Sequence, residues 1–208
     1  MFTGIVEETA QVTQVRATAS GRRFWIAARC AAEVKPGDSV ALDGICLTAE
    51  AMSAAEGTLV LCAMEETLRC TTAGGWRRST RLHLERAMPA GGRFDGHLVQ
   101  GHIDGVAAVV RCGRRGRDFI LSLRLPQGLR RYVISKGSLA VNGVSLTVGE
   151  LRGGLCLLYI IPETLVRTLI GSYRAGSKVN LEVDLIAKYV EHLAAGRGAA
   201  GLQGEDLR

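Results

Sequence analysis

Short apolar runs separated by turn residues dominate the pattern along the chain. Stretches such as Leu59–Cys62 and Leu155–Ile161 are rich in Val, Ile and Leu, which is typical of strands. Asp-Gly and Asn-Gly pairs favour tight hairpins because both central residues accept a positive φ. Many short strands at this spacing predict an all-β barrel or sandwich. The turn signals are Pro36-Gly37-Asp38, Asp43-Gly44, Asn142-Gly143 and Gly153-Gly154.

The two halves of the chain resemble each other at an offset near 97 residues. Ordered blocks with loop-sized shifts between them indicate an internal duplication. We therefore expect an N-terminal unit over residues 1–96 and a C-terminal unit over residues 97–184, with a boundary near Gly96. The matching blocks are Gly4–Glu7 with Gly101–Asp104, Phe24–Arg29 with Phe119–Arg124, Ser39–Thr48 with Ser138–Thr147, Glu66–Leu68 with Glu163–Leu165, and Leu84–Glu85 with Leu181–Glu182.

A different periodicity follows Asp184. Apolar residues recur at helical spacing over Leu185–Leu193, which predicts a short amphipathic helix whose apolar face needs a partner. From Gly196 the chain is rich in Gly and Ala, and we expect this end of the region 185–208 to be loose.

Composition narrows the class of protein. A chain of 208 residues suits two domains of about 100 residues each, and 47% apolar with 22% charged residues is ordinary for a globular protein. The N-terminus lacks the basic head and apolar stretch of a secretion signal. The longest apolar run, Leu155–Ile161, is far shorter than the roughly 20 residues of a membrane-spanning helix. We expect a cytoplasmic protein without a membrane segment.

The cysteines do not predict a metal site, and the basic residues do not predict a nucleic-acid site. The cysteines show no C-x-x-C spacing and lie in apolar runs, so buried, reduced thiols are favoured over disulfides or zinc. A basic cluster contains Gly113 and Gly116 and no stacking aromatic, which favours a solvated hairpin loop over an RNA site. The net charge of +6 would still attract anionic small molecules. The cysteines are Cys30, Cys46, Cys62, Cys70, Cys112 and Cys156, and the cluster is Arg111, Arg114, Arg115 and Arg117.

Four motifs together resemble the riboflavin synthase family, also called the lumazine-binding repeat family. They are the opening Met1–Glu7, the pair Asp43–Thr48 and Asn142–Thr147, the segment Gly96–Gly105 with its His-x4-His, and Lys188–Glu191. The resemblance covers nearly the whole chain. It implies two six-stranded Greek-key barrels, a C-terminal helix that joins three chains into a homotrimer, and one 6,7-dimethyl-8-ribityllumazine in each barrel. Association with lumazine synthase is a further partner that the resemblance suggests.

The implied reaction suits a duplicated fold. One lumazine molecule donates a four-carbon unit to another, which gives riboflavin and 5-amino-6-(D-ribitylamino)uracil, and two similar pockets would hold the two identical substrates. The C7 methyl group of the substrate is acidic because its carbanion delocalises into the ring. We therefore expect no metal and no cofactor, with catalysis resting on positioning, where effective molarities of roughly 10⁵ M or more are possible.

Positions that differ between the halves are the catalytic candidates, because donor and acceptor need different treatment. Cys46 matches Ser145, and His102 matches Ile5. His102 suits a base or proton shuttle near neutral pH, with a surface or core histidine as the alternative. Cys46 and Ser145, just after tight turns, can add to the acceptor ring or stabilise a nucleophile. The alternative for Cys46 is a small buried filler.

Three further residues complete the catalytic set. Asp184, where the first half has Ala87, can orient a histidine or bind a ribityl hydroxyl, and the alternative is a helix N-cap. His97 is either catalytic or a contact to the ring edge. The resemblance adds Ser39.

Substrate contacts are expected from the matched segments of both halves. Lys136, which replaces Gly37, can neutralise an anionic lumazine or be a solvated turn lysine. Phe2 and Thr3 can close over a ligand or pack a core. The predicted contacts are Phe2, Thr3, Gly4, Ile5, Val6, Cys46, Leu47, Thr48, Cys62, Ala63, Met64, Glu65, Glu66, Thr67, Gly101, His102, Ile103, Lys136, Ser145, Leu146, Thr147, Tyr159, Ile160, Ile161, Pro162, Glu163 and Thr164.

Two departures and two rival functions remain. The family usually has two glycines before the first histidine, where this chain has Asp95-Gly96, and His83 stands where the second half has Asn180. Asp95 beside His97 can shift its protonation. A lumazine-carrying optical antenna is the chief rival, and the presence of Cys46, His102, Ser145 and Asp184 together argues against it. A flavin-reductase-type barrel lacks support because no nucleotide-binding G-x-G-x-x-G follows a strand.

Overall fold

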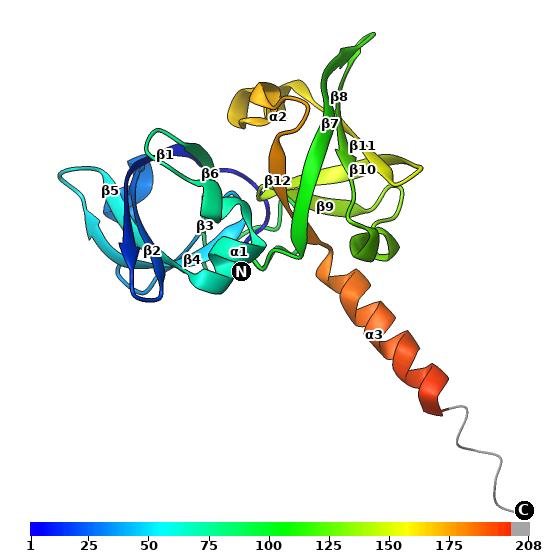
Figure 1. Ribbon diagram of the computed structural model, residues 1–208, viewed down its shortest axis with the longest axis horizontal. Helices are drawn as coiled ribbons and strands as arrows, with labels where there is room; N and C mark the ends of the chain where they lie inside the picture. The colour runs from blue at the N-terminus through cyan, green and yellow to red at the C-terminus, as the bar shows by residue number, and fades with distance from the viewer. Residues whose placement is uncertain (201–208) are drawn as a thin grey trace, which may run out of the picture.

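Two closed six-stranded barrels lie side by side, and one helix leaves the second barrel and points away from both (Figure 1). These features come from a computed structural model, which describes residues 1–200, with side chains as far as Ala194. The strand order is β1-β2-β5-β4-β3-β6 in the first barrel and β10-β11-β8-β7-β12-β9 in the second. In each barrel three hairpin-connected strands precede a fourth that returns beside the first of them, which is a Greek key. The predicted duplicated all-β fold is confirmed.

The two barrels contain the same elements in the same order. The first consists of β1 (Glu8–Thr18), β2 (Gly21–Ala27), η1 (Arg29–Glu33), β3 (Ser39–Leu42), β4 (Ile45–Ser53), β5 (Thr58–Met64), α1 (Glu65–Cys70), η2 (Thr72–Gly75) and β6 (Arg81–Arg86). The second consists of β7 (Gly105–Arg115), β8 (Asp118–Arg124), η3 (Gln127–Tyr132), β9 (Ser138–Val141), β10 (Val144–Arg152), β11 (Leu155–Ile160), α2 (Pro162–Arg167), η4 (Ile170–Ser172) and β12 (Lys178–Val183).

The predicted tight turns form as expected and meet each other between the barrels. Asp43 and Gly44 have φ values of 44° and 77°, and Asn142 and Gly143 have 46° and 77°. A Cβ atom on Gly44 would lie 2.6 Å from the backbone nitrogen of Gly143. Glycine is therefore required at these turns for two reasons, the positive φ and the close approach of the two backbones.

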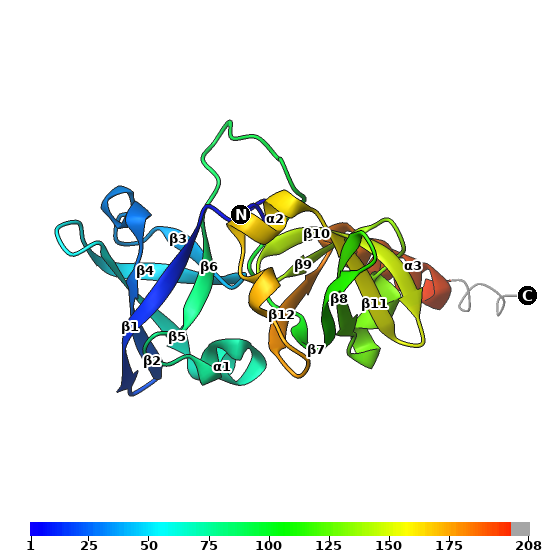
Figure 2. The ribbon, with the colours of Figure 1, turned by 90° about the horizontal axis from the view of Figure 1, so that it is seen from above.

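The segment that leads into each barrel crosses over to the other barrel. Val6 packs in the core of the second barrel, and Ile103 packs against the core of the first. The N–H of Ser145 donates to the carbonyl of Gly4 at 2.8 Å, and the N–H of Cys46 donates to that of Gly101 at 2.9 Å. Figure 2 shows the N-terminus beside α2 of the second barrel. The boundary near Gly96 stays a prediction, but both units contribute chain to each barrel.

An apolar layer and two buried carboxylates hold these crossing segments. Phe2 is fully buried and packs with Val99 against alanines of β3 and β9. Glu85 accepts hydrogen bonds from the N–H groups of Thr3 at 2.7 Å and of Gly4 at 3.0 Å. Glu182 accepts them in the same way from Gln100 at 2.7 Å and Gly101 at 2.9 Å. Burial raises the pKa of both carboxyls, and these backbone hydrogen bonds lower it by less.

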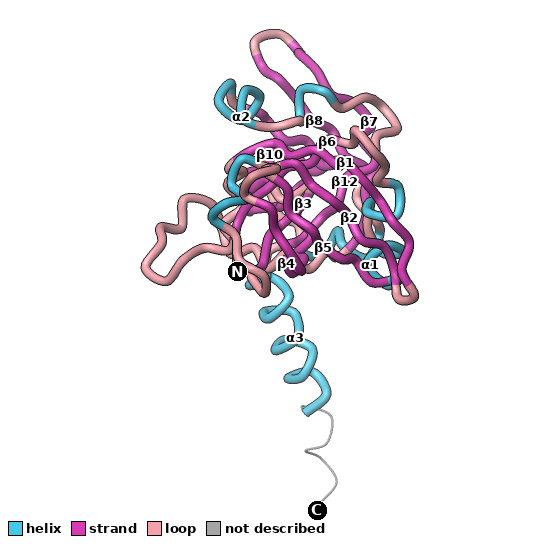
Figure 3. Tube along the Cα trace, turned by 90° about the vertical axis from the view of Figure 1, so that its left-hand side faces the viewer, coloured by secondary structure: helices cyan, strands magenta, loops and turns pink. Residues whose placement is uncertain are grey.

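Helix α3 (Leu185–Ala200) is longer than the predicted Leu185–Leu193 (Figure 3). The expectation of loose chain from Gly196 is wrong as far as Ala200; the rest of that prediction, residues 201–208, lies outside the described residues. Ion pairs of Lys188 with Asp104 at 2.6 Å and of Arg131 with Glu191 at 2.8 Å fix the helix to the second barrel. Ile186, Tyr189, Val190 and Leu193 are 58% to 66% exposed. Within residues 1–200 no helix is long and apolar enough to cross a membrane.

The expectations for cysteines and arginines are confirmed in part. All six cysteines are free, but only Cys30 and Cys156 are buried, and burial raises their pKa to about 12 and about 11. The prediction of burial is wrong for Cys70, which is exposed, whereas Cys46, Cys62 and Cys112 are half-buried. Arg111, Arg114, Arg115 and Arg117 lie exposed on the β7–β8 hairpin, which projects from the barrel in Figure 1.

Candidate active site

A cavity of about 300 Å³ opens on the second barrel between three segments. Gly4, Ile5 and Val6 come from the N-terminus, Val144 and Ser145 begin β10, and α2 with its flanking residues forms the third wall. The volume lies at the lower end of the roughly 300–1,000 Å³ typical of small-molecule sites. We call this cavity the second-barrel pocket. Its remaining lining residues are Ile161, Glu163, Thr164, Arg167 and Thr168.

His97 and Ser145 form a polar pair at this pocket. The Nδ1 atom of His97 lies 2.7 Å from the Oγ atom of Ser145. The backbone N–H of His97 donates to the carbonyl of Thr3 at 3.0 Å. The Nε2 atom of His97 is buried and has no hydrogen-bond partner among the described residues. Burial lowers the pKa of His97, while the Asp184 carboxylate raises it by less. A neutral imidazole with one free nitrogen is suited to take up or return a proton.

The corresponding wall of the first barrel pairs a different set of groups. Gly101 lies against Cys46 so closely that a Cβ atom on Gly101 would be 2.5 Å from the Cys46 Cβ. His102 follows directly and is exposed. In the second-barrel pocket, Gly4 lies against Ser145 and is followed by Ile5. In the first barrel a histidine therefore follows the glycine that contacts Cys46, and in the second an isoleucine follows the glycine that contacts Ser145.

The strand-to-helix segments provide equivalent walls in both barrels. Met64 is 56% exposed and Ile161 is 62% exposed at the ends of β5 and β11. Glu66 and Thr67 of α1 correspond to Glu163 and Thr164 of α2, which line the second-barrel pocket. Five other predicted contacts have buried side chains that pack into the barrel cores or between the barrels: Phe2, Leu47, Ala63, Leu146 and Ile160.

Ser39 and Asp184 lie in two further clefts that also correspond to each other. Ser39 lines a cavity of about 290 Å³ beside Ala87. Asp184 lines one of about 400 Å³ between the second barrel and α3. The Asp184 Oδ1 atom accepts the N–H of Ile186 at 2.9 Å, so its alternative role as the N-cap of the helix is confirmed.

The remaining predicted contacts lie around these walls. Thr48 pairs in register with Ser39, and Thr147 pairs with Ser138. Lys136 is exposed with a φ of 67°, as the equivalent of Gly37. The Tyr159 hydroxyl donates to Glu150 at 2.9 Å. Cys62 is half-buried in β5, Glu65 begins α1, Pro162 begins α2, and Thr3 is held by Glu85.

Sequence reasoning missed three residues of the second-barrel pocket. They are Val144, Arg167 and Thr168. Arg167 forms an i,i+4 ion pair with Glu163, and such neighbours on one helix face are detectable from spacing alone. Thr168 had no such signal, because its position depends on how the chain turns after α2.

The catalytic candidates fall into two groups, one beside each barrel. Within the described residues no hydrogen bond or ion pair joins Cys46, His102 or Ser39 to the His97–Ser145 pair. The turn contact between Gly44 and Gly143 and the buried Phe2 layer fill the space between the barrels. Each barrel therefore carries its own set of candidate groups.

Comparisons with known proteins agree with this architecture. The family model described as the lumazine binding domain matches residues 3–87 and again residues 100–184. Riboflavin synthase from Photobacterium phosphoreum is 40% identical over 197 residues, which is 93% of this chain and 88% of the relative. The riboflavin synthase of Mycobacterium bovis is 39% identical over 203 residues, 95% of this chain and 100% of the relative. That of Bacillus subtilis is 36% identical over 193 residues, 91% of this chain and 88% of the relative.

Solved structures give the same fold. The crystal structure of LumP complexed with 6,7-dimethyl-8-(1'-D-ribityl) lumazine superposes with a TM-score of 0.77 at 21% identity, over 88% of this chain and 99% of that one. LumP complexed with riboflavin gives a TM-score of 0.80 at 22% identity with the same coverage. At this level of identity the likeness concerns the fold of the two barrels.

Proposed function

The chain belongs to the riboflavin synthase family, and on that premise we propose how its two barrels share the reaction. One 6,7-dimethyl-8-ribityllumazine transfers a four-carbon unit to a second, which yields riboflavin and 5-amino-6-(D-ribitylamino)uracil. The enzyme is therefore a transferase that uses the same compound twice. Atoms balance between the two substrates and the two products, so the overall reaction requires neither an oxidant nor a reductant.

We assign one lumazine molecule to each barrel. The observation that carries this assignment is the equivalence of the two walls: the leading segments at Gly4 and Gly101, the turns before Ser145 and Cys46, and the starts of α2 and α1. Backbone groups of the leading segments would face the ring, and hydroxyl and carboxyl groups of Thr67, Glu66 and their counterparts would face the ribityl chain and the uracil edge.

We assign acid–base chemistry to the His97–Ser145 pair. Its support is the 2.7 Å contact together with the buried, unpartnered Nε2 atom. A neutral His97 can accept a proton from the C7 methyl group or from a hydroxyl nucleophile, and a positioned base of this kind typically contributes 10²- to 10⁴-fold. Cys46 and His102 would treat the second substrate, with Cys46 adding to the ring or stabilising a nucleophile and His102 carrying a second proton.

We propose that the reacting pair of pockets forms between subunits of a homotrimer. The first barrel of one subunit would bring Cys46, His102 and Ser39 to the Ser145, His97 and Asp184 of its neighbour. Two features support this. The barrels of one chain are separated by packed side chains, and α3 carries an exposed apolar face of a kind that associates in helical assemblies.

Truncation tests the assembly. Removal of all residues from Leu185 onward should give monomers with little activity, measured by light scattering and by riboflavin formation. Removal of residues 201–208 alone is the matched control and should leave a trimer with full activity. A fully active monomer after the larger deletion would exclude pairing between subunits.

Two further assignments complete the proposal. We place the enzyme in the cytoplasm, in keeping with six free cysteines, because free thiols persist in a reducing compartment. We also propose an association with lumazine synthase. Co-elution of the two purified proteins would support it, and separate elution at micromolar concentrations would contradict it.

Turnover of a single compound tests the function as a whole. The purified protein mixed with 6,7-dimethyl-8-ribityllumazine alone should form yellow, fluorescent riboflavin, with two substrate molecules consumed per product. The uracil product should appear in equal amount. Tight fluorescent binding without turnover would indicate an antenna-type carrier instead.

A further inference from the structure

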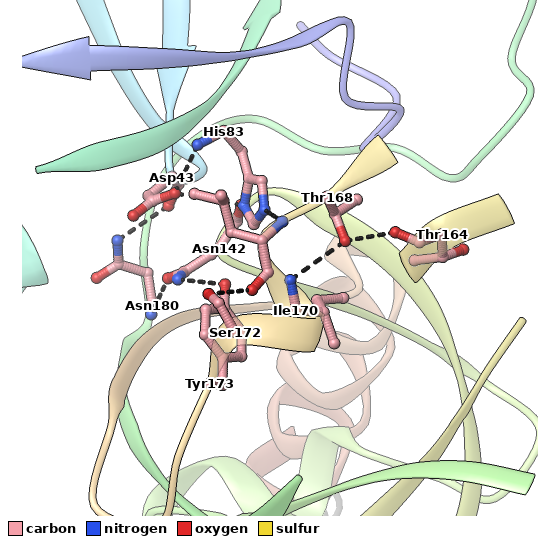
Figure 4. Close-up of polar contacts among 10 residues, drawn as sticks. Asp43, His83, Asn142, Thr164, Thr168, Ile170, Ser172, Tyr173 and Asn180 are labelled. Atoms are coloured by element: carbon pink, nitrogen blue, oxygen red, sulfur yellow. Dashed lines mark hydrogen bonds and ion pairs between the residues drawn. The ribbon is translucent and has the colours of Figure 1, made fainter. Parts of the chain in front are cut away.

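A set of polar contacts joins the two barrels across their shared surface (Figure 4). Asn180 of β12 reaches into the first barrel, where its Nδ2 donates to the carbonyl of Asp43 at 2.9 Å and its Oδ1 accepts the N–H of Thr72 at 2.8 Å. His83 of β6 occupies the equivalent position and reaches into the second barrel. Its Nδ1 lies 2.9 Å from the carbonyl oxygen of Asn142, and its Nε2 accepts the N–H of Leu169 at 2.7 Å.

These partners determine the protonation state of His83. The backbone N–H of Leu169 can only donate, so Nε2 must hold a lone pair, and the carbonyl of Asn142 can only accept, so Nδ1 must hold the proton. The contact therefore requires the neutral imidazole in one tautomer. A second proton on Nε2 would place two N–H groups against each other at 2.7 Å, and the hydrogen bond would be lost.

Leu169 connects His83 to the second-barrel pocket. The next residue toward α2 is Thr168, which lines the pocket and whose Oγ1 donates to the carbonyl of Thr164 at 2.5 Å. The same Oγ1 accepts the N–H of Ile170 at 3.3 Å. A side chain of the first barrel thus holds the backbone that carries one wall of the pocket in the second barrel.

We propose that His83 is a positioning residue for the second-barrel pocket, and that it holds the α2 wall in place only while its imidazole is neutral. Asn180 holds Thr72, the equivalent point after α1, but an amide does not change its charge. The two pockets should therefore respond differently to acid. This inference rests on the proposed function, because the ligand that reports it is the lumazine or flavin of that reaction.

One ionisable group contacts His83 directly, and two others contact Asn142 and Ile170 beside it. The Asp43 Oδ1 atom is 3.3 Å from Nδ1 and accepts the backbone N–H of His83 at 2.9 Å. The Tyr173 hydroxyl accepts from the Asn142 side chain at 2.8 Å, and the Cys112 thiol donates to the carbonyl of Ile170 at 3.2 Å. Burial raises the pKa of both Tyr173 and Cys112, so these two stay neutral in acid.

The direction of the effect follows from these neighbours. Histidine changes its charge between about pH 5 and pH 8. A protonated ring would be attracted to Asp43 on its Nδ1 side, and this attraction cannot restore the bond to Leu169. The contact is therefore present at higher pH and is lost as the pH falls. Release of Leu169 would loosen Thr168 and weaken ligand binding in the second barrel only.

Fluorescence titration of the full-length protein with riboflavin tests the proposal. We expect two binding equivalents, one of which weakens as the pH falls below neutral. H83N should bind and turn over within about twofold of wild type at the higher pH, because an amide can make both contacts, and should lack much of the acid weakening. His97 is unchanged in both proteins, so the difference between their pH profiles isolates His83.

Variants without hydrogen-bonding groups give the matched comparison. H83L should weaken one equivalent about tenfold at the higher pH, which corresponds to about 1.4 kcal/mol, whereas N180L should weaken the other and keep the wild-type acid response. An H83N protein with an unchanged acid response would overturn the proposal, even where H83L does not fold. If the wild-type protein binds two equivalents with this His83-dependent response but forms no riboflavin, the proposed function is refuted and the role of His83 is not.

Discussion

The first and second barrels share their scaffold and differ in their chemistry. Both have a positive-φ turn at the contact between the barrels and a buried glutamate, Glu85 or Glu182, that holds the crossing segment. The pocket walls differ between the barrels: Ser145 is the equivalent of Cys46, and Ile5 is the equivalent of His102. Duplication therefore kept the residues that hold the scaffold and changed side chains on the candidate pocket walls.

A physical reason explains which pairs stayed alike. A buried N–H group without a partner costs about 1–3 kcal/mol, and each glutamate serves two such groups. Glycines at the turn contact have no substitute, since any Cβ atom would meet the opposite backbone below 3 Å. The side chains of a pocket wall face a ligand and not a buried backbone group, so no backbone contact restricts their identity. Divergence at these walls is what two substrates with opposite roles require.

Replacing His97 should have the largest effect, because His97 is the proposed base beside Ser145. H97A should lower kcat by about 10²- to 10³-fold, because it removes the proposed base, with riboflavin affinity changed far less. H102A should slow turnover by about tenfold and also more than it weakens binding. Steady-state kinetics and fluorescence titration measure both. Equal losses of kcat and of affinity in either variant would exclude proton transfer by that residue.

The turn contact should respond equally from either side. G44A and G143A each force a Cβ atom into the opposite turn and add strain at a positive φ, so each should lower the free energy of unfolding by about 2–4 kcal/mol. Urea denaturation of the two variants measures this. G91A lies at a positive φ with nothing within 4 Å of its Cβ and is the matched control for strain alone. If G44A and G143A lose no more than G91A, the close approach does not matter.

The glutamate pair should show a smaller, symmetrical loss. In E85Q and E182Q an amide NH₂ would face a backbone N–H group, and one hydrogen bond would be lost at about 1–3 kcal/mol. Chemical denaturation should give similar values for the two proteins. A loss confined to one of them would show that the two crossing segments are not held equivalently.

The smallest effect is the position of the acid limb of turnover. Burial lowers the pKa of His97, so its neutral, reactive form should persist below its ordinary pKa of about 6.5. Riboflavin formation by H83N, which lacks the other histidine connected to the second-barrel pocket, should therefore fall only in more acidic solution. The dependence of kcat on pH measures this. A fall of kcat that begins above the ordinary histidine pKa would contradict the burial of His97 in the working enzyme.

Much of the fold could be predicted because it is local. Asp43-Gly44 and Asn142-Gly143 specify their turns through backbone preferences, and the repeated apolar blocks specify two similar barrels. The end of α3 was predicted too early, because the Gly- and Ala-rich stretch after Leu193 has a weak amphipathic pattern. Arg167 could have been found from its spacing to Glu163, whereas Thr168 could not.

The sequence by itself determined the duplication, the strands and turns, and the candidate side chains of each half. Only the tertiary structure decided that the leading segments exchange barrels, which brings Gly4 against Ser145 and Gly101 against Cys46. It also decided that His83 and Asn180 reach across to the opposite barrel. The physical reason is that a repeat fixes which residues are equivalent, whereas the choice of barrel for each segment depends on burial and hydrogen bonds between residues far apart in the chain.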